Sequence, residues 1–327
     1  MRLLRVVLNA FLWPPAFLVA GLCATLSIAA QWGRVSLRWD LATQFAPVWL
    51  LGSAICCVTA LVYRRGLRWS LMAVSLIGLG FSASLVVPEF VRSTGPHAPA
   101  HAADQLKIVQ FNVWHENPDP EAILDWLDRE RPDIAVIEEN SAHFRKALTA
   151  RDRGWQVACL QCEVMILSRQ PALSVDNARH GPRDTPGPLT HAIYNDRRGP
   201  FEVIGVHNAW PTDADQPPQE RRLAAFIDGR PRERLIVTGD FNSTPWSFQR
   251  RRWDQAFGIP RRERAVPSWP AHNYKQLRWL GLPFLPFLPI DHVYAGPGWA
   301  TVKVKRGPRL TSDHYPLVVT LAPVAPR

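Results

Sequence analysis

Long uncharged stretches of apolar residues open the chain. They run over Val6–Gly33, Leu41–Tyr63 and Trp69–Pro88. About 20 consecutive apolar residues cross the hydrocarbon core of a bilayer as a helix. Each stretch is long enough, so the pattern predicts a membrane anchor of three transmembrane helices in residues 1–92.

The first stretch contains two adjacent prolines, Pro14 and Pro15. Proline breaks the interior of a helix but is tolerated in its first turn. The spanning helix is therefore expected to begin at these prolines. The alternative is a cleaved signal peptide, because a basic start precedes the apolar run and Ser27-Ile28-Ala29 fits a cleavage site.

The hydrophobic pattern changes after residue 92. Residues 93–104 hold Pro, Gly, Ala and His without apolar periodicity, which is typical of a linker. Residues 105–327 then begin with a β-rich run, Leu106–Trp114. A helix is expected to start at Asp119, and Asp133–Glu139 is a short apolar run that ends in two acids. This second domain is therefore predicted to open with a β-α-β unit.

Further short apolar runs predict more strands than helices in this domain. The strands are expected at Trp155–Ala158, Val164–Ser168, Thr190–Tyr194, Phe201–His207, Leu235–Asp240, Ile290–Tyr294, Trp299–Lys305 and Leu317–Leu321. One helix is expected over Pro218–Asp228, and residues 168–190, rich in Pro, Gly and Arg, are expected to be irregular. This order indicates a layered α/β domain large enough for a full core.

Positive charge is concentrated at the N-terminal part. The chain carries +10, of which eight Arg and two acids give +6 to residues 1–92. Arg2 and Arg5 precede the first apolar stretch, and Arg64–Arg68 lies between the second and third. Short loops rich in Lys and Arg stay in the cytoplasm. Three crossings then place residue 93 and everything after it outside the cytoplasm.

The soluble part holds one pair of cysteines, Cys159 and Cys162, in the sequence C-L-Q-C. A C-x-x-C pair can bind zinc, but no second pair and no suitably spaced histidines accompany it. In an oxidising compartment the two can form a disulfide. Two unlinked cysteines are the alternative.

Polar clusters end several of the predicted strands. They are F-N-V-W with Asn112, I-E-E with Glu138 and Glu139, V-H-N with His207, G-D-F-N with Asp240 and Asn242, I-D-H with Asp291, and S-D-H with Asp313 and His314. Side chains at strand ends converge on one rim of a sheet, where functional sites usually form. Because so many polar clusters end apolar strands, the pattern predicts a functional site at this rim.

On these motifs, residues from about Leu106 to Leu321 resemble the endonuclease/exonuclease/phosphatase superfamily. T-P-W-S after G-D-F-N, together with P-I-D-H-V, is similar to its bacterial membrane-anchored members. The resemblance implies a four-layer α/β/β/α sandwich of two mixed sheets. It also implies a multi-pass protein of a bacterial-type inner or cell membrane, with an extracytoplasmic domain that hydrolyses phosphoesters, most simply phosphodiesters.

The resemblance also implies a metal site. Glu139 is then the principal ligand, with Asn112 beside it and Asp313 completing the set. Carboxylate and amide oxygens suit Mg²⁺, with Mn²⁺ or Ca²⁺ as alternatives. Glu138 should point to the opposite face of the strand from Glu139, because side chains alternate along a strand.

Five further residues take catalytic roles by the same resemblance. His314, oriented by Asp291, contacts the phosphate or acts as base; Asp240 positions or deprotonates the water; Asn242 hydrogen-bonds the phosphate; and His207 lies near the leaving group. Which group moves which proton stays open at this point.

The substrate is not determined by these residues. Arg250, Arg251 and Trp269 belong to a basic and aromatic region that suits single-stranded nucleic acid or anionic lipid headgroups. A lipid headgroup, a nucleic acid or a small phosphoester therefore remain alternatives, and a DNA or RNA nuclease is the main alternative activity. A non-catalytic phosphate-binding or membrane-binding domain is an alternative of another class. No protein partner can be inferred.

One apolar stretch bears on the choice of substrate. Residues 277–290 read LRWLGLPFLPFLPI, with Pro283, Pro286 and Pro289 at every third position. This spacing excludes a long helix or a central strand. The stretch is therefore either a buried irregular loop or an apolar surface that docks on the bilayer.

The charge pattern predicts the side of the membrane on which the C-terminus lies. A reporter fused after Arg327 should be active only if it works outside the cytoplasm, because the arginine-rich loops are expected to stay in the cytoplasm. Paired fusions to an extracytoplasmic and a cytoplasmic reporter measure this. Strong activity of the cytoplasmic reporter at this position contradicts the predicted orientation.

Overall fold

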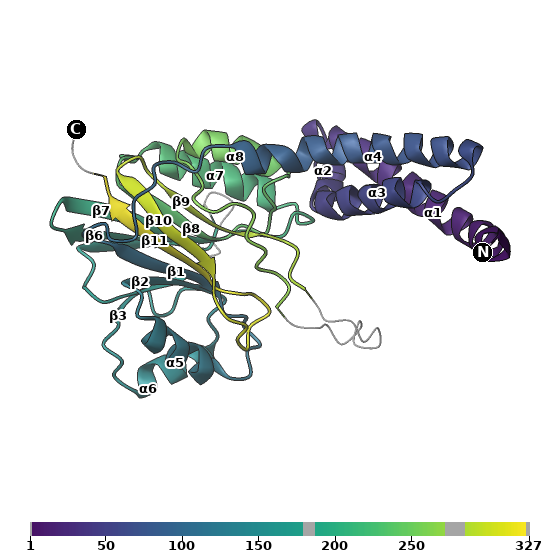
Figure 1. The fold of residues 1–327 in the computed structure, drawn as a ribbon. Coiled ribbons are helices and arrows are strands. Elements are labelled where there is room, and N and C mark those ends of the chain that lie inside the picture. The colour runs from purple at the N-terminus through teal and green to yellow at the C-terminus, as the bar shows by residue number, and fades with distance from the viewer. Residues whose placement is uncertain (1, 179–186, 272–284, 325–327) are drawn as a thin grey trace. The chain divides into compact units, whose positions relative to one another are not determined.

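The computed structural model describes residues 2–178, 187–271 and 285–324. The chain divides into two compact units, shown in Figure 1. One contains residues 1–92 together with residues 245–252, and the other contains residues 93–244 and 253–327. Each unit is described by itself.

The first unit consists of helices. They are α1 (Arg2–Gln31), the short 3₁₀ turn η1 (Trp32–Arg34), α2 (Leu37–Thr43), α3 (Ala46–Ala60), α4 (Arg65–Val91) and the start of α8 (Phe248–Phe257). Within the described residues, Trp13–Arg34 and Arg65–Val91 are long and apolar enough to cross a membrane. The pair α2 and α3 passes the same test only as one span bent by 52°. The unit therefore holds two spans, or three if the bent pair counts as one.

Two details of the predicted anchor need correction. The second apolar stretch is not one continuous helix, because it breaks after Thr43 and restarts with Pro47 in the first turn of α3. Proline is suited to a first turn, where its missing N–H is not needed. In contrast, the helix α1 starts before Pro14 and Pro15 and runs through them, although its candidate span starts at Trp13, where the spanning part was predicted to begin. Prolines are tolerated within membrane helices because neighbouring groups satisfy the freed backbone.

Helix directions in this unit follow from a few side-chain contacts. The hydroxyl groups of Ser27 in α1 and Ser82 in α4 lie 2.6 Å apart, and Gln31 Nε2 donates to Ser84 Oγ at 3.4 Å. Thus α1 and α4 run in the same direction. Cys56 in α3 lies beside the carbonyl oxygen of Ala16, whereas Gly52, earlier in α3, lies beside Cys23, later in α1, so α3 runs the opposite way. Along the chain, α3 therefore runs back in the direction opposite to the two parallel helices α1 and α4.

The second unit is built on two β-sheets. The first has the order β10-β11-β1-β2-β4-β3 and the second β5-β6-β7-β8-β9. The strands are β1 (Leu106–Asn112), β2 (Ile134–Glu138), β3 (Gln156–Ala158), β4 (Met165–Ser168), β5 (Ser174–Ala178), β6 (Leu189–Asp196), β7 (Gly199–His207), β8 (Leu235–Asp240), β9 (Asp291–Ala295), β10 (Trp299–Arg306) and β11 (Leu317–Pro323). The pairs β1–β2 and β7–β8 are parallel and their neighbours antiparallel, which confirms the predicted α/β domain with two mixed sheets.

The main core lies between the sheets. It includes Ile108 and Val136 from one sheet and Val203 and Ile236 from the other, all almost fully buried. Gly205 lets the sheets approach, because a Cβ there would overlap the side chain of Val136. The helices α5 (Pro120–Glu130) and α6 (Ala142–Ala150) cover the outer face of the first sheet, and α7 (Gln216–Asp228) covers the second.

Some elements differ from the sequence-based predictions. The strand β5 lies within the stretch predicted to be irregular. Among the described strands it pairs with β6 alone, at the edge of its sheet, and it carries no run of apolar residues. The helix α6 was not predicted, although Ser141 caps it by accepting from Phe144 N. Much of the stretch 277–290 lies outside the described residues. In its described part, the side chain of Leu285 is 73% exposed, whereas Leu288 is buried.

Candidate active site

Strand directions explain why the polar clusters meet. The parallel strands β1 and β2 end at Asn112 and Glu138, and the parallel strands β7 and β8 end at His207 and Asp240. The strand β9 is antiparallel to β8 and starts opposite Asp240. The strand β11 is antiparallel to β1, so the loop before it reaches the same edge. All six strands thus deliver their clusters to one edge of the two packed sheets.

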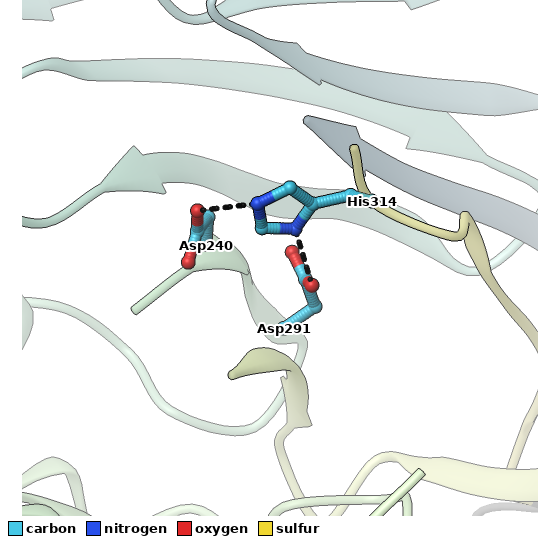
Figure 2. Close-up of side chains that lie close together, drawn as sticks. All are labelled: Asp240, Asp291 and His314. Atoms are coloured by element: carbon cyan, nitrogen blue, oxygen red, sulfur yellow. Dashed lines mark hydrogen bonds and ion pairs between the residues drawn. The ribbon is translucent and has the colours of Figure 1, made fainter. Parts of the chain in front are cut away.

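An imidazole between two carboxylates forms the centre of this edge (Figure 2). His314 Nδ1 lies 2.9 Å from Asp291 Oδ2, and His314 Nε2 lies 3.6 Å from Asp240 Oδ2. All three side chains are buried. Ligand atoms of the three lie within 4.8 Å of one another, so the group is also a candidate metal site.

Burial and mutual attraction set the charges of this group. Burial alone would lower the pKa of His314, but the charges of Asp291 and Asp240 raise that pKa well above its ordinary value. Burial would raise the pKa of Asp291, yet the attraction of His314 lowers it. Burial raises the pKa of Asp240 to about 6, with Asp291 adding to the shift and His314 opposing it. Near neutral pH, His314 is therefore a cation, and Asp240 titrates close to neutrality.

An uncharged layer lies behind these groups. Gln110 Nε2 donates to Asp291 Oδ1 at 2.6 Å and to Glu138 Oε2 at 3.1 Å. Glu138 is fully buried, and burial together with the charges of Asp291 and Asp240 raises its pKa well above the ordinary value. Glu138 is therefore neutral, and it lies between the sheets rather than on the rim.

Glu139 presents its carboxylate to the rim. Its backbone is left-handed, with φ of 54°, which is unusual for this residue and turns the chain sharply after β2. Oε1 accepts from Asn112 Nδ2 at 2.9 Å, and Oε2 lies 2.8 Å from His115 Nδ1. Burial would raise the pKa of Glu139, but His207, Asn112 and His115 lower it to about 2. Glu139 is therefore an anion under any ordinary condition.

A cavity of about 450 Å³ opens beside Glu139. Its lining consists of His115, Glu139, Asn140, Arg145, Gln161, Glu163 and His207. Two carboxylates, two imidazoles and a guanidinium in one cavity suit a charged oxygen-rich ligand such as a phosphate with its cation.

His207 lies on the wall of this cavity and pairs with Glu163. Its Nδ1 is 2.7 Å from Glu163 Oε1, and its Nε2 is 3.6 Å from Glu139 Oε1 and 3.8 Å from Asp240 Oδ2. Burial would lower the pKa of His207, but the hydrogen bond to Glu163 and the charges of Asp240 and Glu139 raise it to about 9. His207 is therefore a second cation at the rim.

A short disulfide loop precedes Glu163. Cys159 and Cys162 are bonded to each other. Asn140 Nδ2 donates to the carbonyl oxygens of Cys162 and Glu163 at 2.7 and 2.8 Å. These contacts hold the backbone that presents Glu163 to His207.

Asn242 follows β8 in a tight turn. Its N–H donates to Asp240 Oδ1 at 2.8 Å, and its φ of 49° is one that asparagine tolerates. Its Nδ2 donates to Asn208 O at 2.9 Å. Among the described residues, Asn242 Oδ1 is buried without a hydrogen-bond partner. An acceptor in that position can take a hydrogen bond from a bound water or ligand.

A match of the sequence to a protein family agrees with the geometry of this rim. Residues 109–314 match the model of the endonuclease/exonuclease/phosphatase family. The chain belongs to this family. The match spans every polar cluster of the rim, from β1 to the loop before β11.

Solved structures of the family's fold superpose on the chain. A functionally unknown conserved protein from Enterococcus faecalis V583 does so with a TM-score of 0.52 and 17% identity, covering 67% of this chain and 100% of its own. TDP2 from D. rerio, complexed with a single-strand DNA product, does so with a TM-score of 0.50 and 14% identity, covering 67% and 99%. At these identities the likeness concerns the fold. A search of the curated proteins finds no match.

The remaining residues predicted for the family's site fall in different places. Asp313 lies on the loop before β11 and accepts from Trp269 Nε1 at 3.3 Å. The Trp269 ring packs edge-on against Trp210, at 5.8 Å between centroids. Arg250 is fully buried, and Arg251 donates to the carbonyl of Leu85 inside the helical unit. Contact of substrate with Arg250 or Arg251 stays a prediction.

Three residues in contact with the site were not singled out from the sequence as part of it. Glu163, Gln110 and His115 reach it from a loop, from the interior of β1 and from the turn after β1. Gln110 gave a usable signal, because it is a polar residue flanked by the apolar residues Val109 and Phe111. Glu163 gave none, because its partner His207 is 44 residues away in the chain.

The pair of Glu163 and His207 predicts a measurable titration. Replacing Glu163 with Gln removes the anion that stabilises the imidazolium, so the pKa of His207 should fall from about 9 by roughly one unit or more. NMR of histidine-labelled protein measures this titration. Glu116→Gln, an exposed carboxylate near His115, is the matched control. An unchanged His207 titration in Glu163→Gln would refute the assigned role of the pair.

Proposed function

We propose that this chain is a metal-dependent phosphoesterase that hydrolyses phosphodiesters from a membrane-anchored, extracytoplasmic domain. The observation that carries the proposal is the buried group of Asp240, Asp291 and His314. Burying two carboxylates around an imidazole is costly, because the charges lose their hydration. Buried titratable groups with strongly shifted pKa values are typical of functional sites. The same edge also offers Glu139 and His207 in an open cavity.

The anchor supports the location. Because α1 and α4 run in the same direction and α3 returns, we count the bent pair of α2 and α3 as a full crossing. Three crossings and the arginine-rich loops put the catalytic domain outside a bacterial-type inner or cell membrane. The family domain is taken to be a four-layer sandwich with its site at the strand edge.

The residues present fit a hard divalent cation, for which Mg²⁺ is proposed. Glu139 is ionised, and its side chain is 23% exposed to the cavity. The alternative group around His314 is less suitable, because each ring nitrogen already faces a carboxylate and the imidazole is protonated. We therefore place the cation at Glu139, with Asn112 and Asp313 as further ligands. When bound, such a cation neutralises phosphate charge and favours ionisation of a water.

Asp240 and His207 divide the proton transfers. Asp240, with a pKa of about 6, takes a proton from the attacking water as that water forms a bond to phosphorus. His207, kept protonated by Glu163, gives a proton to the leaving oxygen as the bond from phosphorus to that oxygen breaks. The products are an alcohol and a phosphate monoester.

Two more residues act on the phosphate and the water without transferring a proton. His314 remains a cation between Asp240 and Asp291, and it stabilises the charge that develops on the phosphate oxygens. Asn242 Oδ1 accepts a hydrogen bond from the water and holds it beside Asp240.

A nuclease is the second candidate, and one observation favours it. Trp210 lies three residues after His207, is 50% exposed, and packs against Trp269. An exposed indole beside a phosphoesterase site offers a stacking surface for a nucleobase. Comparing DNA, RNA, phospholipid and a small diester as substrates separates this candidate from the general phosphodiesterase.

The proposed roles predict severe losses in three variants. Glu139→Ala, Asp240→Ala and His314→Ala should each lower kcat for a small phosphodiester by about 10²-fold or more, because each removes a group that acts on the reacting atoms. Steady-state kinetics of the full-length protein measures this. His143→Ala, an exposed histidine on α6, should keep wild-type activity. A folded His314→Ala protein with wild-type kcat would exclude the proposed mechanism.

Metal removal gives a separate prediction. Chelation should abolish turnover, and added Mg²⁺ should restore it. Glu139→Gln should raise the Kd for Mn²⁺, used as a calorimetric probe, by about tenfold or more, whereas Asp291→Asn should change it little. The opposite ranking of the two variants would move the metal to the group around His314.

A further inference from the structure

The start of α8 is held by a residue of the predicted membrane anchor. Residues 245–252 belong to the same compact unit as residues 1–92, although they lie inside the family-matched part of the chain. Within this unit, Asp40 accepts from Ser247 Oγ at 2.7 Å, from Phe248 N at 2.9 Å and from Gln249 N at 3.0 Å. Asp40 is thus the acceptor for the first two N–H groups of α8.

The remaining groups at this helix start are also satisfied. Ser247 Oγ accepts from Arg250 N at 3.1 Å, and Ser247 O accepts from Arg251 N at 3.1 Å. The first N–H groups of a helix have no partners within the helix, and a nearby anion is stabilised by the helix dipole. The cap is therefore complete, but half of it comes from a residue more than 200 positions away.

Asp40 is buried, and its carboxylate is stabilised by hydrogen bonds rather than by water. Its exposed fraction is 4%, and its fourth hydrogen bond comes from Thr43 Oγ1 at 3.1 Å. The four donors that reach it are neutral N–H or O–H groups. A buried carboxylate is costly unless it is fully hydrogen-bonded. Its burial between two apolar stretches is therefore explained by the cap that it provides.

Neighbouring contacts in the unit are equally close. Trp246 Nε1 donates to Gln44 O at 3.0 Å, and Arg252 donates to Arg34 O at 3.1 Å. A Cβ at Gly33 would lie 2.8 Å from Asp40 Oδ1 and 3.1 Å from the ring of Phe248. Glycine at this position permits the approach of η1 to the capped helix.

The capped segment continues directly from the catalytic turn. Asp240 ends β8, Asn242 lies in the turn after it, and Ser247 begins the cap. Only Ser243, Thr244, Pro245 and Trp246 lie between Asn242 and Ser247, and His292 Nε2 holds Ser243 by its carbonyl oxygen at 2.8 Å. Four residues leave little chain to absorb a shift of the helix start.

We propose that Asp40 is a positioning residue: the anchor caps α8 and thereby holds the Asp240–Ser247 segment in its working conformation. The capping role of Asp40 is inferred from its hydrogen bonds alone. The effect on turnover rests on the proposed phosphoesterase function. The anchor is then a structural part of the enzyme as well as its attachment to the membrane.

Hydrogen exchange and kinetics of the full-length protein test both parts. In Asp40→Ala, amides 248–250 should exchange about fivefold faster or more, the change expected for a lost cap. For a small soluble diester, kcat should fall by about tenfold or more with KM nearly unchanged. Asp40→Asn keeps one acceptor oxygen and should lie between Asp40→Ala and wild type. Arg38→Ala, an exposed residue of the same helix α2, should match wild type in both measurements.

Each outcome decides one part. Unchanged exchange at residues 248–250 in Asp40→Ala overturns the cap. Faster exchange with wild-type kcat overturns the positioning role. If wild-type protein hydrolyses no phosphoester, the exchange result still decides the cap, and the proposed function fails separately. If Asp40→Ala does not fold, Ser247→Ala and Asp40→Asn are compared with wild type in the same exchange and kcat measurements.

Discussion

The attraction between His314 and its two buried carboxylates is the interaction on which the rest of the site depends. Removing three ionisable groups from water is costly, and the alternation of charge between Asp291, His314 and Asp240 helps to offset that cost. The surrounding residues follow from this constraint. Gln110 contributes an N–H to Asp291, and Glu138 is kept neutral so that no further anion adds to the repulsion. The result is one fixed cation and one carboxylate that titrates near neutrality.

Much of this arrangement could be predicted from the sequence. Apolar runs ending in Asn112, Glu139, His207 and Asp240 indicate strands that finish at one edge, because parallel strands end together. The two mixed sheets were implied by the family resemblance of these motifs, and the strand pairing confirms them. Glu163 could not be predicted, since its pairing with His207 depends on how the loop before β4 folds. The strand β5 was missed because an edge strand with one neighbour carries a weak apolar signal.

The predicted anchor also has features that its composition did not reveal. Uninterrupted apolar composition predicted the helices, because a bilayer imposes a minimum length on them. It did not predict the bend between α2 and α3, which depends on where Pro47 begins a new helix. It also could not show that Asp40 caps a helix in the family-matched region. An acid between apolar stretches has the composition of an ordinary loop, and only the fold reveals its partners.

The central claim is that water, activated beside Asp240, attacks phosphorus. Hydrolysis of a small phosphodiester by the full-length protein in ¹⁸O-labelled water, with the products weighed by mass spectrometry, tests it most directly. The account predicts one labelled oxygen in the phosphate monoester for each bond that is broken and none in the alcohol. Label in the alcohol, or no turnover of any phosphodiester in the presence of Mg²⁺, would contradict it.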